Sequence, residues 1–312
     1  MEFFKNPNLN FVGAMKVAFS VSAGLVIISV VLMLIHGGPR LSIDFTGGTV
    51  LQVKIDPAPQ VQDIRSILEG RGYQGVQVTV FGSADEFLIT FASPDVAEGE
   101  EVATLDAAQL LLDQLRAGLA SSEIELRREE SVGPKIGGEL RTAAANSIIA
   151  ALVMIVLYIT FRFVFKYGVA AIVALVHDVT LTLGVFSLMN LEISLSIIAA
   201  FLTIIGYSLN DTIVVFDRIR ENMKTRRKET YREVINRSIN ECLSRTVLTS
   251  VTTFFVAATL YVFGGPVIND FAFALCLGVI VGTYSSMFIA APVLVWWNDR
   301  GAAGHKRSVS DM

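Results

Sequence analysis

Four ionisable side chains fall within long apolar stretches of this sequence, where a charge is costly to keep. They are His177, Asp178, Asp211 and Arg245. Charged groups at membrane depth are rare and usually belong to ion or proton pathways. Burial favours the protonated form of a carboxyl group, and a nearby arginine favours the ionised form. A carboxylate whose distance from an arginine changes could therefore bind and release a proton during a conformational cycle.

Hydroxyl side chains accompany two of these charges at helical spacing. Tyr207 and Ser208 precede Asp211 by four and three residues, and Thr249 follows Arg245 by four. Residues three or four apart share one helix face, so we expect polar stripes that face protein or a water-filled cavity. We predict that Asp211 and Arg245 couple proton movement to conformation. The residues predicted to relay protons or support this pair are His177, Asp178, Tyr207, Ser208 and Thr249.

Other interpretations of the same residues remain open. Asp211 and Arg245 could form a static ion pair that locks two helices, although buried pairs stabilise proteins only weakly. His177 could equally be a packing histidine with satisfied hydrogen bonds. Asp178 and Asp211 could mimic an aspartyl protease dyad, and Ser208 could suggest a serine nucleophile. No histidine lies on the Ser208 helix and no Gly-x-Ser-x-Gly motif occurs, so we predict a protein that is not an enzyme.

The elements that must position these residues are membrane-spanning helices. The 312-residue chain is 53% hydrophobic and only 17% charged, which is more apolar than soluble domains. Six apolar stretches approach the ~20 residues that a bilayer requires. We interpret the first as a span rather than a signal peptide, because no small-residue cleavage site follows it. The predicted spans are 17–35, 142–161, 168–189, 193–216, 243–263 and 271–296.

Lys and Arg residues concentrate in alternate connections between these spans, and nine of them lie between residues 217 and 245. Basic loops stay in the cytoplasm, so we predict that both termini are cytoplasmic and that residues 36–140 lie outside. We also predict that the loop 217–242 is amphipathic and lies on the cytoplasmic membrane surface. The predicted divisions are 1–35 (N-terminus and first span), 36–140 (outer domain), 141–297 (spans two to six) and 298–312 (tail).

The outer segment alternates between strand and helix patterns in the order βαββαβ. Strands are predicted at 41–55, 76–82, 86–92 and 123–132, and helices at 59–72 and 100–119. This order is that of an α+β ferredoxin-like domain, with two helices on one face of an antiparallel sheet.

Eight basic against 17 acidic residues give the segment a net charge of −9, which argues against nucleic-acid binding. Gly47-Gly48 predicts a turn rather than a phosphate cradle, and the two cysteines and three histidines form no metal motif.

Five motifs together resemble the SecF family of protein-export membrane proteins, within the resistance-nodulation-division superfamily. The resemblance extends from the first span to the sixth. The motifs are "IDFTGGT" (43–49), "VGPKIGGEL" (132–140), "VALVHD" (173–178), "GYSLNDTIVVFDRIREN" (206–222) and "SRTVLTS" (244–250).

This resemblance implies an α-helical membrane protein that forms half of a twelve-span bundle with a SecD partner. It implies a bacterial inner-membrane complex that uses the proton-motive force to assist late steps of protein export. The implied partners are SecD, the SecYEG channel, YajC, YidC, the ATPase SecA and the exported unfolded polypeptide. In the family, the aspartate and arginine of two motifs serve proton coupling, and these match Asp211 and Arg245. No cofactor is implied, and protons are the coupling ion.

Two other functions are compatible with the sequence. The chain could be half of a proton-driven exporter of small molecules or lipids from the same superfamily, although such exporters usually carry two halves and two large outer domains. It could also be an assembly factor that stabilises a translocation channel without moving protons. The assembly-factor hypothesis predicts that neutralising Asp211 leaves export intact.

Overall fold

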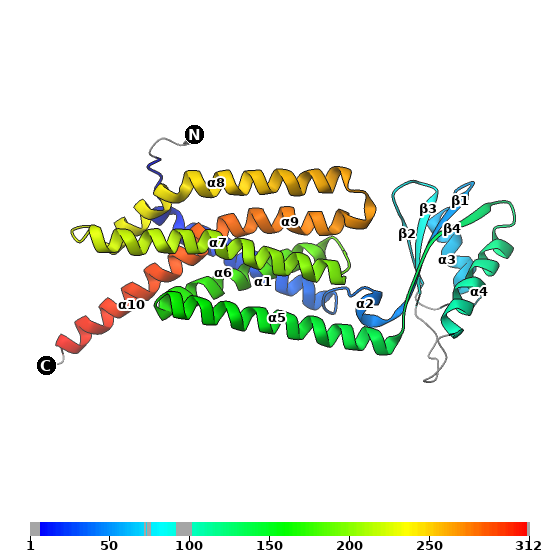
Figure 1. The fold of residues 1–312 in the computed structure, drawn as a ribbon, viewed down its shortest axis with the longest axis horizontal. Coiled ribbons are helices and arrows are strands. Elements are labelled where there is room, and N and C mark those ends of the chain that lie inside the picture. Colours follow the sequence, from blue (N-terminus) through cyan, green and yellow to red (C-terminus); the bar gives the residue numbers. More distant parts are fainter. Residues whose placement is uncertain (1–6, 72, 74–75, 92–101, 311–312) are drawn as a thin grey trace. The chain divides into compact units, whose positions relative to one another are not determined.

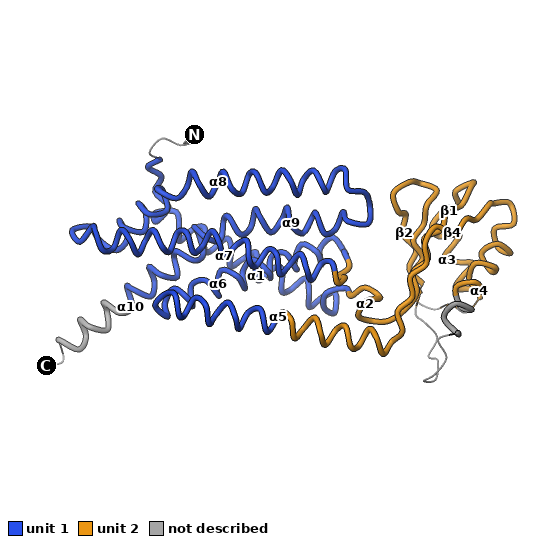
Figure 2. Tube along the Cα trace, viewed as in Figure 1, with its two compact units in different colours: residues 1–40, 148–191, 196–312 blue, residues 41–147, 192–195 orange. Residues whose placement is uncertain are grey.

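The computed structural model describes residues 7–71, 73, 76–91 and 102–310, with the backbone alone for 102–107 and 301–310. It divides into two compact units, which are described separately (Figure 2). Unit 1 comprises residues 1–40, 148–191 and 196–312. Unit 2 comprises residues 41–147 and 192–195. The start of the predicted helix 100–119 lies partly outside the described residues, and the side chains of 102–107 lie outside the described side chains.

Among the described residues, six helical stretches are long and apolar enough to cross a membrane, which confirms the number and approximate positions of the predicted spans (Figure 1). The last stretch joins three consecutive elements, including a short π-helix, η1. The elements are α1 (Phe11–Ile35), α5 (Pro134–Arg162), α6 (Phe165–Leu188), α7 (Leu195–Thr225), α8 (Tyr231–Phe263), α9 (Pro266–Ser285), η1 (Ser286–Ala290) and α10 (Ala291–Ser310).

Three of the six helical stretches form the interior of unit 1. In the most apolar stretch of α6, α7 and the α9–α10 helix, 50%, 50% and 56% of residues are buried, against 11%, 6% and 17% in α1, α5 and α8. α6 packs against α1, α9 and η1, and α8 packs along α9. The apolar side chains left exposed on α1, α5 and α8 suit contact with lipid or with another membrane protein.

The segment 217–242, predicted as one amphipathic loop, consists largely of the ends of two long helices, and its predicted place on the membrane surface stays a prediction. α7 runs on to Thr225, and α8 already begins at Tyr231. A capping box starts α8: the Thr230 hydroxyl accepts a hydrogen bond from the backbone of Glu233, and the Glu233 carboxylate accepts one from the backbone of Thr230. Charged side chains hold the two helix ends together, with Arg218 paired to Glu241 at 2.6 Å.

Unit 2 contains the predicted βαββαβ domain. Its strands are β1 (Gly48–Asp56), β2 (Gln77–Val80), β3 (Glu86–Phe91) and β4 (Glu123–Val132), and its helices are α2 (Ile43–Thr46), α3 (Val61–Glu69) and α4 (Val102–Gly118). The sheet order is β2-β3-β1-β4 with antiparallel neighbours, as a ferredoxin-like domain requires. Alternate residues of β1, namely Leu51, Val53 and Ile55, lie in the core of unit 2. Helices α3 and α4 cover one face of the sheet there (Figure 1).

The double glycine precedes and starts β1. It explains why the observed strand begins at Gly48 rather than at residue 41, as predicted. Residues 43–46 form the short helix α2, and Gly47 and Gly48 follow it with φ of +73° and +140°. A β-carbon on Gly47 would lie 2.8 Å from Cα of Pro134, and one on Gly137 would lie 2.9 Å from the nitrogen of Gly47. The two glycine-containing motifs therefore pack directly on each other, and only glycine permits this approach.

Candidate functional site

Two carboxylates lie inside unit 1, on its interior helices. Asp178 on α6 is 1% exposed, and Asp211 on α7 is 3% exposed. A carboxylate at such a place must be hydrogen-bonded or neutral, because an isolated buried charge is strongly unfavourable. The hydrogen-bond partners of the two groups differ, and this difference indicates how each can behave.

Asp178 is the centre of a polar cluster between three helices. The hydroxyl of Ser208 on α7 donates to its Oδ2 at 2.5 Å, and the hydroxyl of Ser285 on α9 donates to the same oxygen at 2.8 Å. Both serines are buried. Hydrogen bonds to a carboxylate are among the stronger ones in proteins, so this cluster ties α6, α7 and α9 together.

His177 completes this cluster on the other carboxylate oxygen. Its Nδ1 lies 2.9 Å from Oδ1 of Asp178, and its ring stacks on Tyr284 with centroids 6.2 Å apart. The Tyr284 hydroxyl donates to the carbonyl of Ala18 on α1, which fixes the tyrosine ring. Nε2 of His177 is buried and has no hydrogen-bond partner among the described residues. This histidine is therefore half satisfied, and its other nitrogen can accept or donate one further hydrogen bond.

Asp211 is bonded far more weakly. Its Oδ2 lies 3.5 Å from the hydroxyl of Ser250 on α8, which is a long contact. That hydroxyl also accepts hydrogen bonds from Tyr207 at 3.2 Å and from Thr283 on α9 at 2.6 Å. A single contact of this length gives a buried carboxylate little stabilisation. Of the two carboxylates, Asp211 is thus the one with less hydrogen-bond support from its neighbours.

Arg245 and Thr249 do not reach Asp211 directly. In the described part of the chain no hydrogen bond or ion pair joins Arg245 to Asp211, and the Arg245 residue is exposed. The Thr249 hydroxyl donates to carbonyls of its own helix, at Arg245 and Thr246. The structure therefore brings together His177, Asp178 and Ser208 in one cluster and Tyr207 and Asp211 in another. The roles of Arg245 and Thr249 stay predictions.

α7 packs closely on α9 beside the two clusters. A β-carbon on Gly278 would lie 2.3 Å from Ile204, and one on Gly282 would lie 3.0 Å from Cβ of Ser208. These glycines have the Gly-x-x-x-Gly spacing that lets membrane helices approach closely. The π-helix Ser286–Ala290 begins just beyond, and π-bulges are frequent at functional sites.

Sequence reasoning missed the hydroxyl groups that α8 and α9 contribute. Each of these hydroxyl groups lies in an apolar stretch whose hydropathy indicates only a membrane span. The available signal was the polar run "GTYSS" at 282–286, since hydroxyl side chains between membrane helices commonly bond to a neighbouring helix. The missed residues are Ser250, Thr283, Tyr284 and Ser285.

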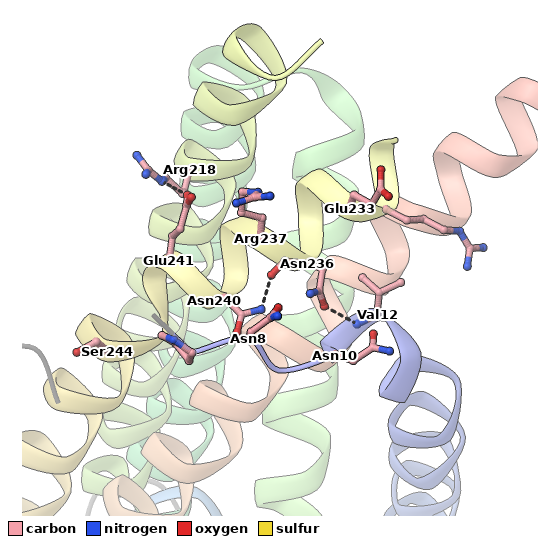
Figure 3. A pocket seen from close by; sticks show the side chains of 12 residues that line it. Asn8, Asn10, Val12, Arg218, Glu233, Asn236, Arg237, Asn240, Glu241 and Ser244 are labelled. Carbon is pink, nitrogen blue, oxygen red and sulfur yellow. Dashed lines mark hydrogen bonds and ion pairs between the residues drawn. The ribbon is translucent and has the colours of Figure 1, made fainter. Parts of the chain in front are cut away.

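A second polar region surrounds a cavity of about 900 Å³ at the end of α8 (Figure 3). Asn240 both donates to and accepts from the backbone of Leu9, at 2.9 and 2.8 Å. Asn236 accepts from the Val12 amide at 3.1 Å, so two asparagines hold the segment before α1. The arginines that line the cavity all have acidic partners, which leaves little charge for a ligand. The pairs are Arg218–Glu241, Arg232–Asp299 and Arg237–Glu229.

Among the described residues, no group of three or more His, Cys, Asp or Glu side chains is placed to hold a metal ion. The polar clusters are instead built from carboxylates, hydroxyls and one imidazole. Such groups bind and pass protons through hydrogen bonds.

Two family models match the chain. Residues 113–300 match "Protein export membrane protein SecD/SecF, C-terminal", and residues 33–59 match "SecD/SecF GG Motif". The first match contains both polar clusters, and the second contains α2 and β1.

Curated relatives agree with these matches. The chain is 46% identical over 297 residues to the "Protein translocase subunit SecF" of Desulfurispirillum indicum, covering 94% of this chain and 93% of the relative. It is 39% identical over 305 residues to the "Protein translocase subunit SecDF" of Thermus thermophilus, covering 96% of this chain and 40% of the relative.

The crystal structure of SecDF from Thermus thermophilus, described as a translocon-associated membrane protein, is similar to this fold. The TM-score is 0.83 at 39% identity, with 94% of this chain covered. This chain spans only 39% of that structure's chain.

Proposed function

Since this chain belongs to the SecD/SecF family of protein export membrane proteins, we propose that it is the SecF-type subunit of a bacterial protein translocase. In this proposal it uses the proton-motive force to help move unfolded polypeptides across the inner membrane. The observation that carries the coupling step is the contrast between the two buried carboxylates. Among the described residues Asp178 has hydrogen-bond contacts with Ser208, Ser285 and His177, whereas Asp211 has one long contact.

Asp211 is the proposed proton-binding group. In the proposed cycle Asp211 carries a proton while it is buried between α7 and α8. A shift of α7 against α8 would bring Asp211 toward water or toward Arg245, where the ionised form is favoured and the proton leaves. Each charge that crosses the membrane gains about 2.3 kcal/mol per 100 mV, which can drive such a helix movement.

Tyr207, Ser250 and Thr283 provide the proposed proton path beside Asp211. Their hydroxyls form a connected chain at 3.2 and 2.6 Å, and each hydroxyl can both donate and accept. Asp178 and His177 are proposed to support the neighbouring helix contacts, with the free Nε2 of His177 as a further proton acceptor. Protons are the only coupling ion in this account, and no cofactor or enzymatic step is part of it.

A SecD-type chain is the proposed partner. The related Thermus protein carries the name SecDF, and this chain matches 40% of its length. The remainder of that protein is therefore available to supply the second half of the bundle. The apolar faces of α1, α5 and α8 are candidate contact surfaces for it. Association with SecYEG, YajC and YidC, and action on polypeptides delivered by SecA, follow only from family membership.

The proposed orientation places both termini in the cytoplasm and residues 36–140 outside the inner membrane. It rests on the basic residues between 217 and 245, because Lys and Arg are retained on the cytoplasmic side. Cysteine-accessibility labelling of a residue in unit 2 and of one in the 226–230 turn would test it, and labelling from outside must reach the former alone.

Cells depleted of the chain test the function itself. We expect a secreted precursor to accumulate inside such cells, and the wild-type chain to restore export. A proton-driven small-molecule or lipid exporter would instead leave precursor processing unchanged while altering the efflux of its substrate. Normal export in depleted cells would overturn the proposed function.

A further inference from the structure

A carboxylate from unit 2 caps the helix that carries Asp211. Oδ2 of Asp44 accepts a hydrogen bond of 2.9 Å from the backbone amide of Leu195, the first residue of α7. The first amides of any helix lack partners within the helix, and that end carries a partial positive charge. Asp44 is 151 residues distant in sequence, so this cap joins separate parts of the chain.

A backbone bridge reinforces the cap. The Ser42 amide donates to the carbonyl of Ile193 at 3.0 Å, and Leu41 pairs with Ile193 as an isolated parallel bridge. Residues 192–195, which contain the start of α7, accordingly cluster with unit 2 rather than with the rest of their helix. The chain entering α7 is thus held at two successive points.

The short helix α2 that presents Asp44 is itself fixed. The Ser42 hydroxyl accepts from the Asp44 amide at 3.3 Å and so caps α2, while the Thr46 hydroxyl donates to the Ser42 carbonyl at 3.1 Å. Gly47, immediately after α2, packs on Pro134 at the start of α5. One four-residue helix therefore contacts the beginnings of two membrane helices.

We propose that Asp44 is a positioning residue for proton coupling: by capping α7 it sets the axial position and rotation of the helix that carries Ser208 and Asp211. This inference rests on the proposed function. Asp211 lies 16 residues beyond Leu195, about 24 Å along a continuous helix at 1.5 Å per residue. A displacement or rotation of the start of α7 would therefore change the contacts of both residues.

The cap requires a hydrogen-bond acceptor rather than a charge, and this requirement makes it testable. Asparagine caps helices about as well as aspartate, whereas alanine cannot. Asp44→Asn should therefore retain coupling and Asp44→Ala should lose it. Asp211 follows the opposite rule in the proposed function, because asparagine there keeps hydrogen bonding but cannot titrate. The two sites are distinguished by the same substitution.

Asp63 offers a matched control within unit 2. Its Oδ2 accepts from the Gln60 amide at 3.2 Å and caps α3, so it has the same chemistry as Asp44 without touching α7. Leu195→Pro provides a second variant that leaves Asp44 intact. Proline at the first helical position removes the amide donor while fitting the helix backbone, so it tests the same bond if Asp44→Ala fails to accumulate.

The experiment measures precursor export in cells with and without an ionophore, together with the membrane abundance of each variant. We expect Asp44→Ala and Leu195→Pro to lower the ionophore-sensitive share of export about fivefold at wild-type abundance, with Asp44→Asn and Asp63→Ala close to wild type. The inference is overturned if Asp44→Ala retains coupling, if Asp44→Asn is as defective as Asp44→Ala, or if Asp63→Ala is equally defective. Asp211→Asn is measured in parallel, and normal coupling in that variant contradicts the proposed function instead.

Discussion

The hydroxyl of Ser285 donates to Oδ2 of Asp178 at 2.8 Å, across the interface between α9 and α6. Both residues are almost completely buried. The bond lies directly before the π-helix that interrupts the last span, where the helix surface changes register. It thereby links Asp178, which also bonds to Ser208, to the start of the π-helix.

Removing this donor should destabilise the bundle. We expect Ser285→Ala to cost ~1–2 kcal/mol of unfolding free energy in detergent, because a buried carboxylate loses one of its donors. The adjacent variant Ser286→Ala is the control, since that hydroxyl donates to the Thr283 carbonyl of its own helix. Equal losses in both variants would show that the Asp178 cluster contributes nothing specific.

The approach of α7 to α9 depends on Gly278. A β-carbon there would overlap Ile204, so Gly278→Ala should cost ~1–3 kcal/mol and lower the folded fraction of the purified chain. Adding Ile204→Ala removes the obstructing atoms and should recover part of that loss. A double variant that is less stable than the sum of the single variants would contradict close packing at this point.

In unit 2, the Ser83 hydroxyl donates to Oδ1 of Asp85 at 2.5 Å and Lys54 lies 3.3 Å from the other oxygen. The Ser83 hydrogen bond is the main cause that holds the pKa of Asp85 below its usual value, with smaller contributions from the backbone and Lys54. Because the pKa is lowered in the folded state, the stabilisation is present above about pH 4 and is lost as the pH falls through the folded pKa.

Ser83→Ala should therefore lower the thermal unfolding midpoint of the detergent-solubilised chain at pH 6, with a difference from wild type that shrinks in acid. Ser122→Ala is the control, because that hydroxyl donates to the Pro57 carbonyl and not to a carboxylate. A Ser83→Ala difference that stays constant down to pH 3 would contradict the assigned cause.

Asn240 should keep the segment before α1 in place. Asn240→Ala removes two hydrogen bonds to the Leu9 backbone, so we expect amide exchange at Leu9 to accelerate about fivefold or more. Arg237→Ala alters the same cavity without contacting Leu9 and should leave that exchange rate unchanged. Hydrogen exchange followed by mass spectrometry reports both, and unchanged exchange in Asn240→Ala would contradict this role.

Periodicity predicted the elements of this protein well. Long apolar runs located the six spans, and the alternation of Leu51, Val53 and Ile55 identified a core strand, because both patterns record burial along a single element. The end of α7 was misjudged for the converse reason. Basic residues mark a membrane edge but do not stop a helix, whereas the Thr230–Glu233 capping box fixes where α8 begins.

The sites were only partly predictable. Spacing predicted that Ser208 shares a helix face with Asp211, but its hydroxyl bonds to Asp178 on a different helix. Spacing along one helix defines a face and says nothing about which neighbour meets that face. Ser285 was missed because a single hydroxyl barely lowers the hydropathy of a span. Such contacts depend on how helices pack, which a single sequence does not specify.

The most direct test of the account is precursor export in cells whose only copy of the chain carries Asp211→Asn, measured with and without an ionophore. Asp217→Asn is the matched control, since Asp217 lies six residues further along α7 and pairs with Arg162 at the surface. We predict that precursor accumulates in the Asp211→Asn cells at normal membrane abundance, and that the ionophore adds no further defect. Export at the wild-type rate with full ionophore sensitivity would contradict proton coupling at Asp211.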